Sequence, residues 1–148
     1  MKTINGNLID LALKEHIDVI VHGCNCFNTM VSGFARVVRD NFPLAYKADQ
    51  ATTFGDKGKL GTIEVIDCDG IDVVNCYTQY NYGMDRRYVD YDALRSCLRS
   101  VHLHYANTTK AIGMPLIGAG LGGGEPTIIL QIMEDEIPEA TVVLLPKR

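Results

Sequence analysis

Positive charge, long apolar runs and paired cysteines are all scarce in this sequence of 148 residues. Lysine and arginine number 14 against 18 aspartates and glutamates, which gives a formal net charge of −4. A protein that coats nucleic acid is normally basic, so this charge argues against general nucleic-acid binding. The apolar runs are too short to cross a bilayer, so we expect no membrane contact.

The five cysteines do not form a disulfide framework, because their number is odd and their spacing is scattered. None of them forms the C-x-x-C pair of a zinc ribbon. Cys24 and Cys26 would lie on one face of a strand, and we expect buried thiols there rather than metal ligands. The segment 1–16 lacks the apolar core and cleavage site of a signal peptide. These features favour a cytoplasmic protein without a bound metal.

The length suits one domain over residues 1–148. Short β-branched runs alternate with segments of helical periodicity, which is typical of an α/β fold with helices on both faces of a mostly parallel sheet. A turn at 67–70 joins two neighbouring strands. Pro43 should kink or split the longest N-terminal helix. We expect strands at 2–5, 18–22, 61–66, 71–77, 112–116 and 141–145, and helices at 8–14, 34–50, 89–105 and 127–136.

Two loops rich in glycine follow expected strands, at 23–33 and 118–124. Ligands of such sheets bind beyond the carboxyl ends of the strands, so both loops should meet at one cleft. Glycine permits positive φ and lets a ligand approach the backbone closely. Free amides beside a helix N-terminus form an anion site. We therefore expect these loops to bind phosphate groups.

Two common nucleotide-binding motifs do not fit the sequence. Gly118, Gly120 and Gly123 match G-x-G-x-x-G, but no acidic residue ends the next expected strand to hold a ribose. A P-loop also fails, because Lys59 is followed by Leu60 instead of serine or threonine.

Three segments in order resemble the macro domain family, across nearly the whole chain. Residues 6–9 read Gly-Asn-Leu-Ile, residues 22–26 read His-Gly-Cys-Asn-Cys, and residues 114–123 read Met-Pro-Leu-Ile-Gly-Ala-Gly-Leu-Gly-Gly. The resemblance implies a three-layer α/β/α macro domain with a mixed, mostly parallel central sheet. The His-x-Cys-Asn-Cys loop is similar to that of the yeast-type ADP-ribose-1″-phosphate phosphatases, in the branch that also contains terminal ADP-ribose hydrolases.

The resemblance also implies a ligand, ADP-ribose or ADP-ribose-1″-phosphate, and a set of contacts for each of its parts. Neutral backbone dipoles would bind the diphosphate without a basic patch. Asn25 would hold the distal ribose. The adenine would meet Asn7, Leu8 and Leu145, one phosphate would meet Val31, Ser32, Gly33 and Phe34, and the other would meet Gly118, Ala119, Gly120, Leu121 and Gly122.

The activity that the resemblance implies is removal of the 1″-phosphate by a monomer without metal or cofactor. His22 and Asn25 are the candidate catalytic residues, because a histidine suits acid–base work near neutral pH. The alternative for His22 is a buried structural histidine. Removal of ADP-ribose from protein or nucleic acid is a second hypothesis, although Gln79 and Gly122 stand where that branch has lysine and aspartate. A non-catalytic ADP-ribose reader is a third.

Overall fold

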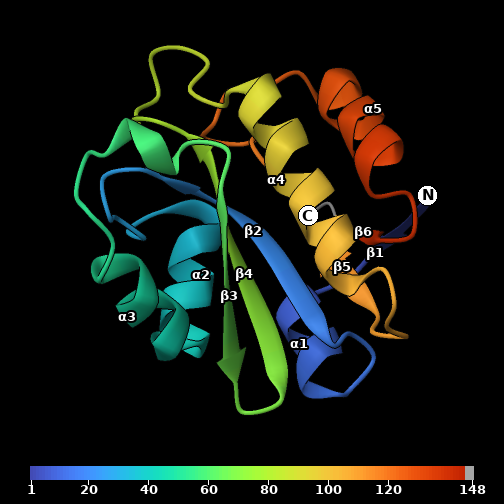
Figure 1. Cartoon of the computed structure of the whole chain (residues 1–148). Helices are drawn as coiled ribbons and strands as arrows, with labels where there is room; N and C mark the ends of the chain where they lie inside the picture. The colour runs from blue at the N-terminus through green and yellow to red at the C-terminus, as the bar shows by residue number, and fades with distance from the viewer. Residues whose placement is uncertain (146–148) are drawn as a thin grey trace.

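The computed structural model describes residues 1–145, and these form a six-stranded sheet in the order β1-β6-β5-β2-β4-β3. Neighbouring strands pair in parallel, except for the antiparallel hairpin of β3 and β4. Figure 1 shows the sheet running through the centre of the molecule. The strands are β1 (Lys2–Asn5), β2 (Val19–Asn25), β3 (Ile63–Cys68), β4 (Ile71–Gln79), β5 (Ile112–Met114) and β6 (Thr141–Leu144).

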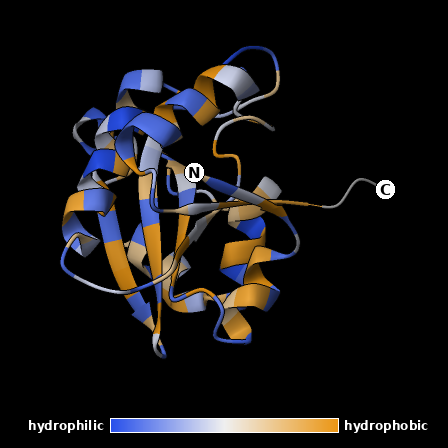
Figure 2. Ribbon diagram, turned by 90° about the vertical axis from the view of Figure 1, so that its right-hand side faces the viewer, coloured by the Kyte–Doolittle hydropathy of each residue, from blue (hydrophilic) through white to orange (hydrophobic). Residues whose placement is uncertain are grey.

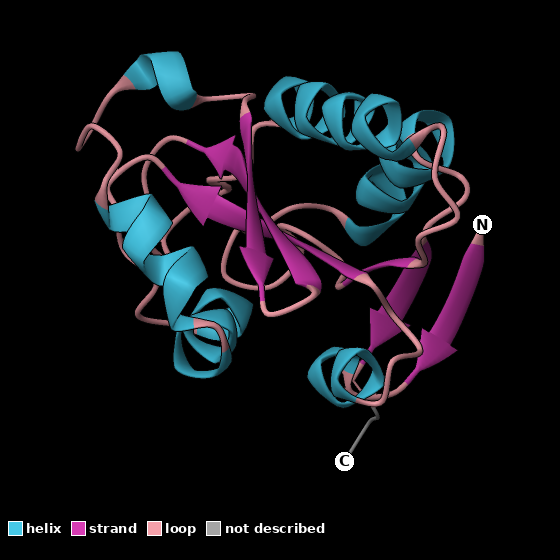
Figure 3. Cartoon of the chain, turned by 60° about the horizontal axis from the view of Figure 1, so that its bottom comes forward, coloured by secondary structure: helices cyan, strands magenta, loops and turns pink. Residues whose placement is uncertain are grey.

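Helices cover both faces of the sheet, as Figure 3 shows. Ile20 of β2 packs in the core cluster beneath α1, α2 and α3, whereas Val19 and Val21 pack in the cluster beneath α4 and α5. Figure 2 shows long hydrophobic stretches on the interior strands. The predicted three-layer α/β/α fold with a mixed, mostly parallel sheet is confirmed. The helices are α1 (Leu8–Leu13), α2 (Gly33–Asn41), α3 (Pro43–Gln50), α4 (Tyr91–Tyr105) and α5 (Pro126–Glu136).

The segment 34–50 is split at Pro43, as the sequence predicted: Phe42 leaves the helical conformation at φ −132° and Pro43 starts α3. Other local features differ from the sequence prediction. The expected loop at 23–33 begins too early, since β2 pairs with β4 as far as Asn25. A short 3₁₀ helix, η1 (Lys57–Lys59), was not predicted.

Five strands point the same way, and this places their carboxyl ends at one edge of the sheet. The turn between β3 and β4 lies at the opposite edge. Among the helices within residues 1–145, none combines the length and the apolar character needed to cross a bilayer.

Candidate binding cleft

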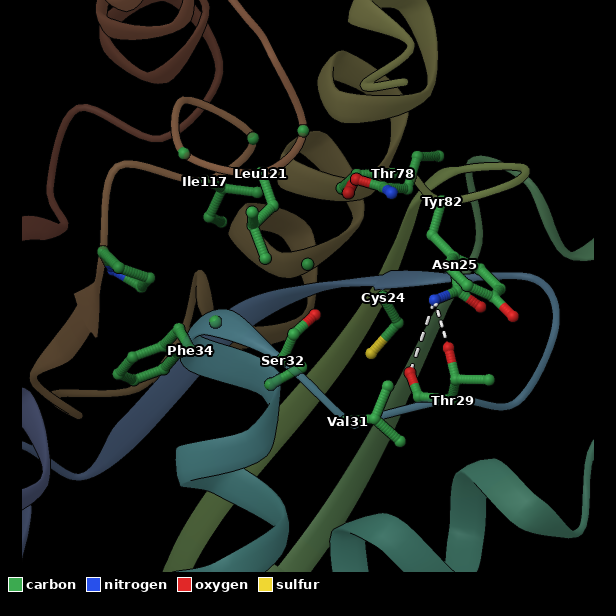
Figure 4. A pocket seen from close by; sticks show the side chains of 18 of the residues that line it. Cys24, Asn25, Thr29, Val31, Ser32, Phe34, Thr78, Tyr82, Ile117 and Leu121 are labelled. Atoms are coloured by element: carbon green, nitrogen blue, oxygen red, sulfur yellow. Dashed lines mark hydrogen bonds between the residues drawn. The ribbon is translucent and has the colours of Figure 1, made fainter. Parts of the chain in front are cut away.

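A cleft of about 660 Å³ opens at the edge where β2, β4 and β5 end (Figure 4). The two predicted loops meet there: a Cβ atom on Gly33 would lie 3.5 Å from Cδ1 of Leu121. The structure thus brings both glycine-rich loops to one cavity. The lining residues are Gly23, Cys24, Asn25, Thr29, Val31, Ser32, Gly33, Phe34, Ala35, Thr78, Gln79, Tyr82, Gly83, Met84, Pro115, Leu116, Ile117, Gly118, Gly120, Leu121 and Gly122.

One wall of the cleft is the N-terminus of α2. Ser32 is the N-cap residue, but its side chain makes no capping hydrogen bond. The amides of the first helical turn have no partner within their own helix, and the helix dipole concentrates positive charge at this end. Gly33, the first residue of α2, adopts φ +60°, a left-handed conformation that favours glycine. This wall can therefore accept an anion through backbone N–H groups.

The opposite wall is the glycine loop after β5. Gly118 adopts φ +80°, and the Gly124 amide donates to the Gly118 carbonyl oxygen over 2.7 Å. A Cβ atom on Gly122 would lie 2.7 Å from the same carbonyl oxygen, so the tight turn leaves no room for a side chain there. Within residues 1–145, the amides of Gly120, Leu121 and Gly122 donate to no protein acceptor.

Asn25 ends β2 at the cleft and is almost buried. Its Nδ2 donates to the Thr29 hydroxyl oxygen at 2.7 Å and to the Thr29 carbonyl oxygen at 3.3 Å (Figure 4). Its Oδ1 accepts from the Phe27 amide at 2.8 Å. The amide group of Asn25 therefore holds the turn after β2 in shape.

His22 is absent from the cavity lining, and its catalytic role stays a prediction. Strand alternation turns its ring to the α2–α3 face of the sheet, where it is 1% exposed and lies near Phe34. The contact between His22 Nε2 and Asn75 Oδ1 measures 2.6 Å. Burial lowers the pKa of His22 to about 4, although the Asn75 hydrogen bond opposes the shift. The ring is therefore neutral near pH 7, and it lies next to Cys24 and Phe34, which line the cavity.

Most of the predicted phosphate contacts line the cavity, but the predicted adenine contacts do not. Asn7 caps α1 by accepting from the Asp10 amide at 3.1 Å, and Leu8 is buried in the core. Leu145 is 75% exposed. Ala119 packs against the core and is absent from the lining as well.

Sequence reasoning did not assign Thr78 or Gln79 of β4 as ligand contacts. Thr78 and Gln79 end a parallel strand beside β2, so the shared strand edge was the signal that could have found them. The loop after β4 reaches the cavity at Tyr82. Its arginines turn away: Arg86 pairs with Asp85 at 3.2 Å, and the Arg87 guanidinium stacks 4.2 Å from the centre of the Tyr91 ring.

The cleft contains few groups that can exchange a proton. Among the described residues that line it there is no His, Asp, Glu, Lys or Arg. The lining thiol belongs to Cys24, and burial raises its pKa well above the usual value. Residues 1–145 contain no cluster of three or more His, Cys, Asp or Glu side chains arranged to hold a metal ion. The lining therefore offers a ligand backbone amides, hydroxyl groups and side-chain amides.

No family model matches this sequence. The chain is 34% identical to an uncharacterized 17.5 kDa protein of Enterobacteria phage T4. The alignment of 152 residues covers 98% of this chain and 95% of the phage protein.

Solved structures show where the fold recurs. A protein of unknown function from Bacteroides thetaiotaomicron matches with a TM-score of 0.81 and 24% identity, over 98% of this chain and 97% of that one. The macrodomain of Mycobacterium tuberculosis DarG matches over 100% of both chains, with a TM-score of 0.72 and 18% identity. Thermosipho africanus DarTG in complex with ADP-ribose matches 89% of this chain and 39% of its own, with a TM-score of 0.69 and 20% identity.

Proposed function

We propose that this chain, which belongs to the family of the phage T4 17.5 kDa protein and has the macrodomain fold, binds ADP-ribose in the cleft. The observation that carries the proposal is the pair of facing backbone walls, the α2 N-terminus and the glycine loop, across a cavity of about 660 Å³. The similar Thermosipho africanus protein is in complex with ADP-ribose, which supports the choice of ligand.

The diphosphate is the part of the ligand that the cleft suits best. One phosphate would accept hydrogen bonds from the amides that begin α2, and the other from the amides of Gly120, Leu121 and Gly122. The distal ribose would lie near Asn25, whose side chain also supports the neighbouring turn. The adenine contacts at Asn7 and Leu145 stay a prediction, and they require the ligand to extend beyond the cavity towards β1 and β6.

Isothermal titration calorimetry with ADP-ribose tests this proposal. Val31 lines the cleft and is 55% exposed, so Val31→Asp places a carboxylate at the phosphate wall without opening the core. We expect affinity to fall about tenfold or more, because like charges repel at this short range. Val37→Asp is the matched control, since Val37 is 40% exposed on α2 and does not line the cavity. Equal binding by both variants and the wild type, or no binding by the wild type, would contradict the proposed site.

Binding has more support than either reaction that the resemblance implies, removal of the 1″-phosphate or removal of ADP-ribose from a modified macromolecule. Both reactions need a group that moves a proton or stabilises a leaving group, and the lining offers amides and hydroxyls without a carboxylate or imidazole. We expect purified protein incubated with ADP-ribose-1″-phosphate to bind it and to release no phosphate above a no-protein blank. Release that Val31→Asp abolishes would instead show that this cleft is a phosphatase site.

A further inference from the structure

The turn at Asn28 precedes the cleft wall formed by the N-terminus of α2. It is held by the side chains of Gln50, Thr52 and Lys59. Asn28 adopts φ +57°, a left-handed conformation that is uncommon outside glycine. Its Nδ2 donates to the Thr52 carbonyl oxygen at 2.8 Å, and its own carbonyl oxygen accepts from Gln50 Nε2. Asn28 directly precedes Thr29, the residue to which Asn25 is bonded at the cleft. The position of this turn therefore decides where the cleft wall stands.

Lys59 of η1 reaches the same turn from behind. Its Nζ donates to Asn28 Oδ1 at 2.7 Å and to the Thr52 hydroxyl oxygen at 2.9 Å. The side chain is 8% exposed, and Nζ lies 5.2 Å from the centre of the Tyr77 ring. A buried ammonium is costly unless it is paired. These contacts compensate that cost, and the one to Asn28 reaches the turn that leads into the cleft wall.

Two acidic side chains, Asp49 and Glu64, lie near Lys59 and feel its charge. Asp49 is fully buried and accepts from the Tyr77 hydroxyl at 2.9 Å. Burial raises the pKa of Asp49 and of Glu64, and the charge of Lys59 opposes both shifts. The cluster of Lys59, Asp49, Glu64 and Tyr77 lies on the α3 side of β3 and β4, outside the cavity lining.

We propose that Lys59 is a positioning residue for the cleft: its ammonium fixes the Asn28 turn, and the turn holds Thr29 and Val31 in the conformation that the ligand needs. Lys59 does not line the cavity, so it acts through the order of the turn. A wall that is ordered before binding loses less conformational entropy when the ligand arrives. The inference rests on the proposed function, because affinity for ADP-ribose is its readout.

Lys59→Met tests the proposal against the matched control Lys57→Met. Both lysines belong to η1, but Lys57 is exposed and lies over the Tyr80 ring at 5.1 Å. Calorimetry with ADP-ribose is done at a temperature where circular dichroism shows both variants folded. We expect Kd to rise about tenfold for Lys59→Met and to stay within about twofold for Lys57→Met. Hydrogen exchange of the ligand-free protein should quicken at residues 28–34 in Lys59→Met and stay unchanged in β5.

Asn28→Gly removes Asn28 Oδ1, one of the two acceptors of Lys59, while glycine keeps the left-handed backbone. It should weaken binding to a similar extent, and adding Lys59→Met to it should cause little further loss. If Lys59→Met does not fold, Asn28→Gly alone tests the proposal. Wild-type Kd in either folded variant would overturn the inference, because a purely structural role lowers stability without changing affinity per folded molecule. If the wild type binds no ADP-ribose, the proposed function fails, and hydrogen exchange alone decides whether Lys59 orders the turn.

Discussion

The residues beneath the cleft support it without contacting the cavity. His22 and Asn75 are buried and bonded to each other, and Asn75 Nδ2 also donates to the Ala45 carbonyl oxygen at 3.0 Å. This pair ties β2 and β4 to α3 directly below the loops that face the ligand. Because the His22 ring is buried and neutral near pH 7, protonating it in acid should lower the free energy of unfolding.

Protonation of His22 should lower the stability of the folded protein in acid. Its folded pKa of about 4 lies below the ordinary value of 6.5, so the unfolded chain binds this proton more readily. The contribution of His22 is complete above pH 6.5 and is lost as the pH falls towards 4. Urea unfolding at pH 7 and pH 5 should show a loss from this group of about 2 kcal/mol.

The control for this titration is His22→Gln, which cannot take up the proton. Burial raises the pKa of Asp49 and Glu64, so these groups contribute stability at low pH that is lost as the pH rises, opposite to His22. They are present in both proteins, and the difference between the two pH profiles isolates His22. Cys24 Sγ lies 3.8 Å from the ring and stays a neutral thiol over this range. Parallel profiles for wild type and variant would contradict the shift.

At the scale of elements, the strands and helices could be predicted because each has a clear period. The β-branched run before His22 and the spacing of Leu94, Leu98 and Val101 identified β2 and α4. The loop Gly118–Gly124 could be placed because it follows a strand and precedes a helix. The end of β2 was missed, since Cys24 and Asn25 have no strong preference for strands and pair only because β4 continues beside them.

The candidate site was predictable in its backbone and less so in its side chains. Glycines show where a ligand can approach amides, and those positions do line the cavity. The absence of His22 from the lining was not predictable, because it shares a strand face with Cys24, which does line the cavity, but lies two residues further from the carboxyl end of β2. The link from Lys59 to Asn28 spans 31 residues and depends on the path of the chain after α3. No local pattern in the sequence indicates such a contact.

The whole molecule carries a net charge of −4, and its proposed ligand is also an anion. Binding is possible because the field at the cleft comes from backbone dipoles, which are local and carry no net charge. The arginines of α4 are paired with acids of α5: Arg95 Nη1 lies 3.1 Å from Asp135, and Arg99 Nη2 lies 3.0 Å from Glu136. These cations are paired with carboxylates and do not line the cleft.

The salt dependence of binding should therefore differ from that of a site built on lysine and arginine. Salt screens charges beyond about 10 Å at 0.1 M, so it weakens the repulsion between the acidic protein and the diphosphate while leaving short amide contacts intact. We expect Kd for ADP-ribose to change by less than about threefold between 50 and 500 mM NaCl, with any change towards tighter binding. Calorimetry with ADP-ribose over this range of salt measures the change in Kd. We expect Val31→Asp to gain affinity more steeply than the wild type as salt rises. A tenfold loss of wild-type affinity at high salt would mean that cationic side chains hold the phosphates, and the backbone account of this cleft would be wrong.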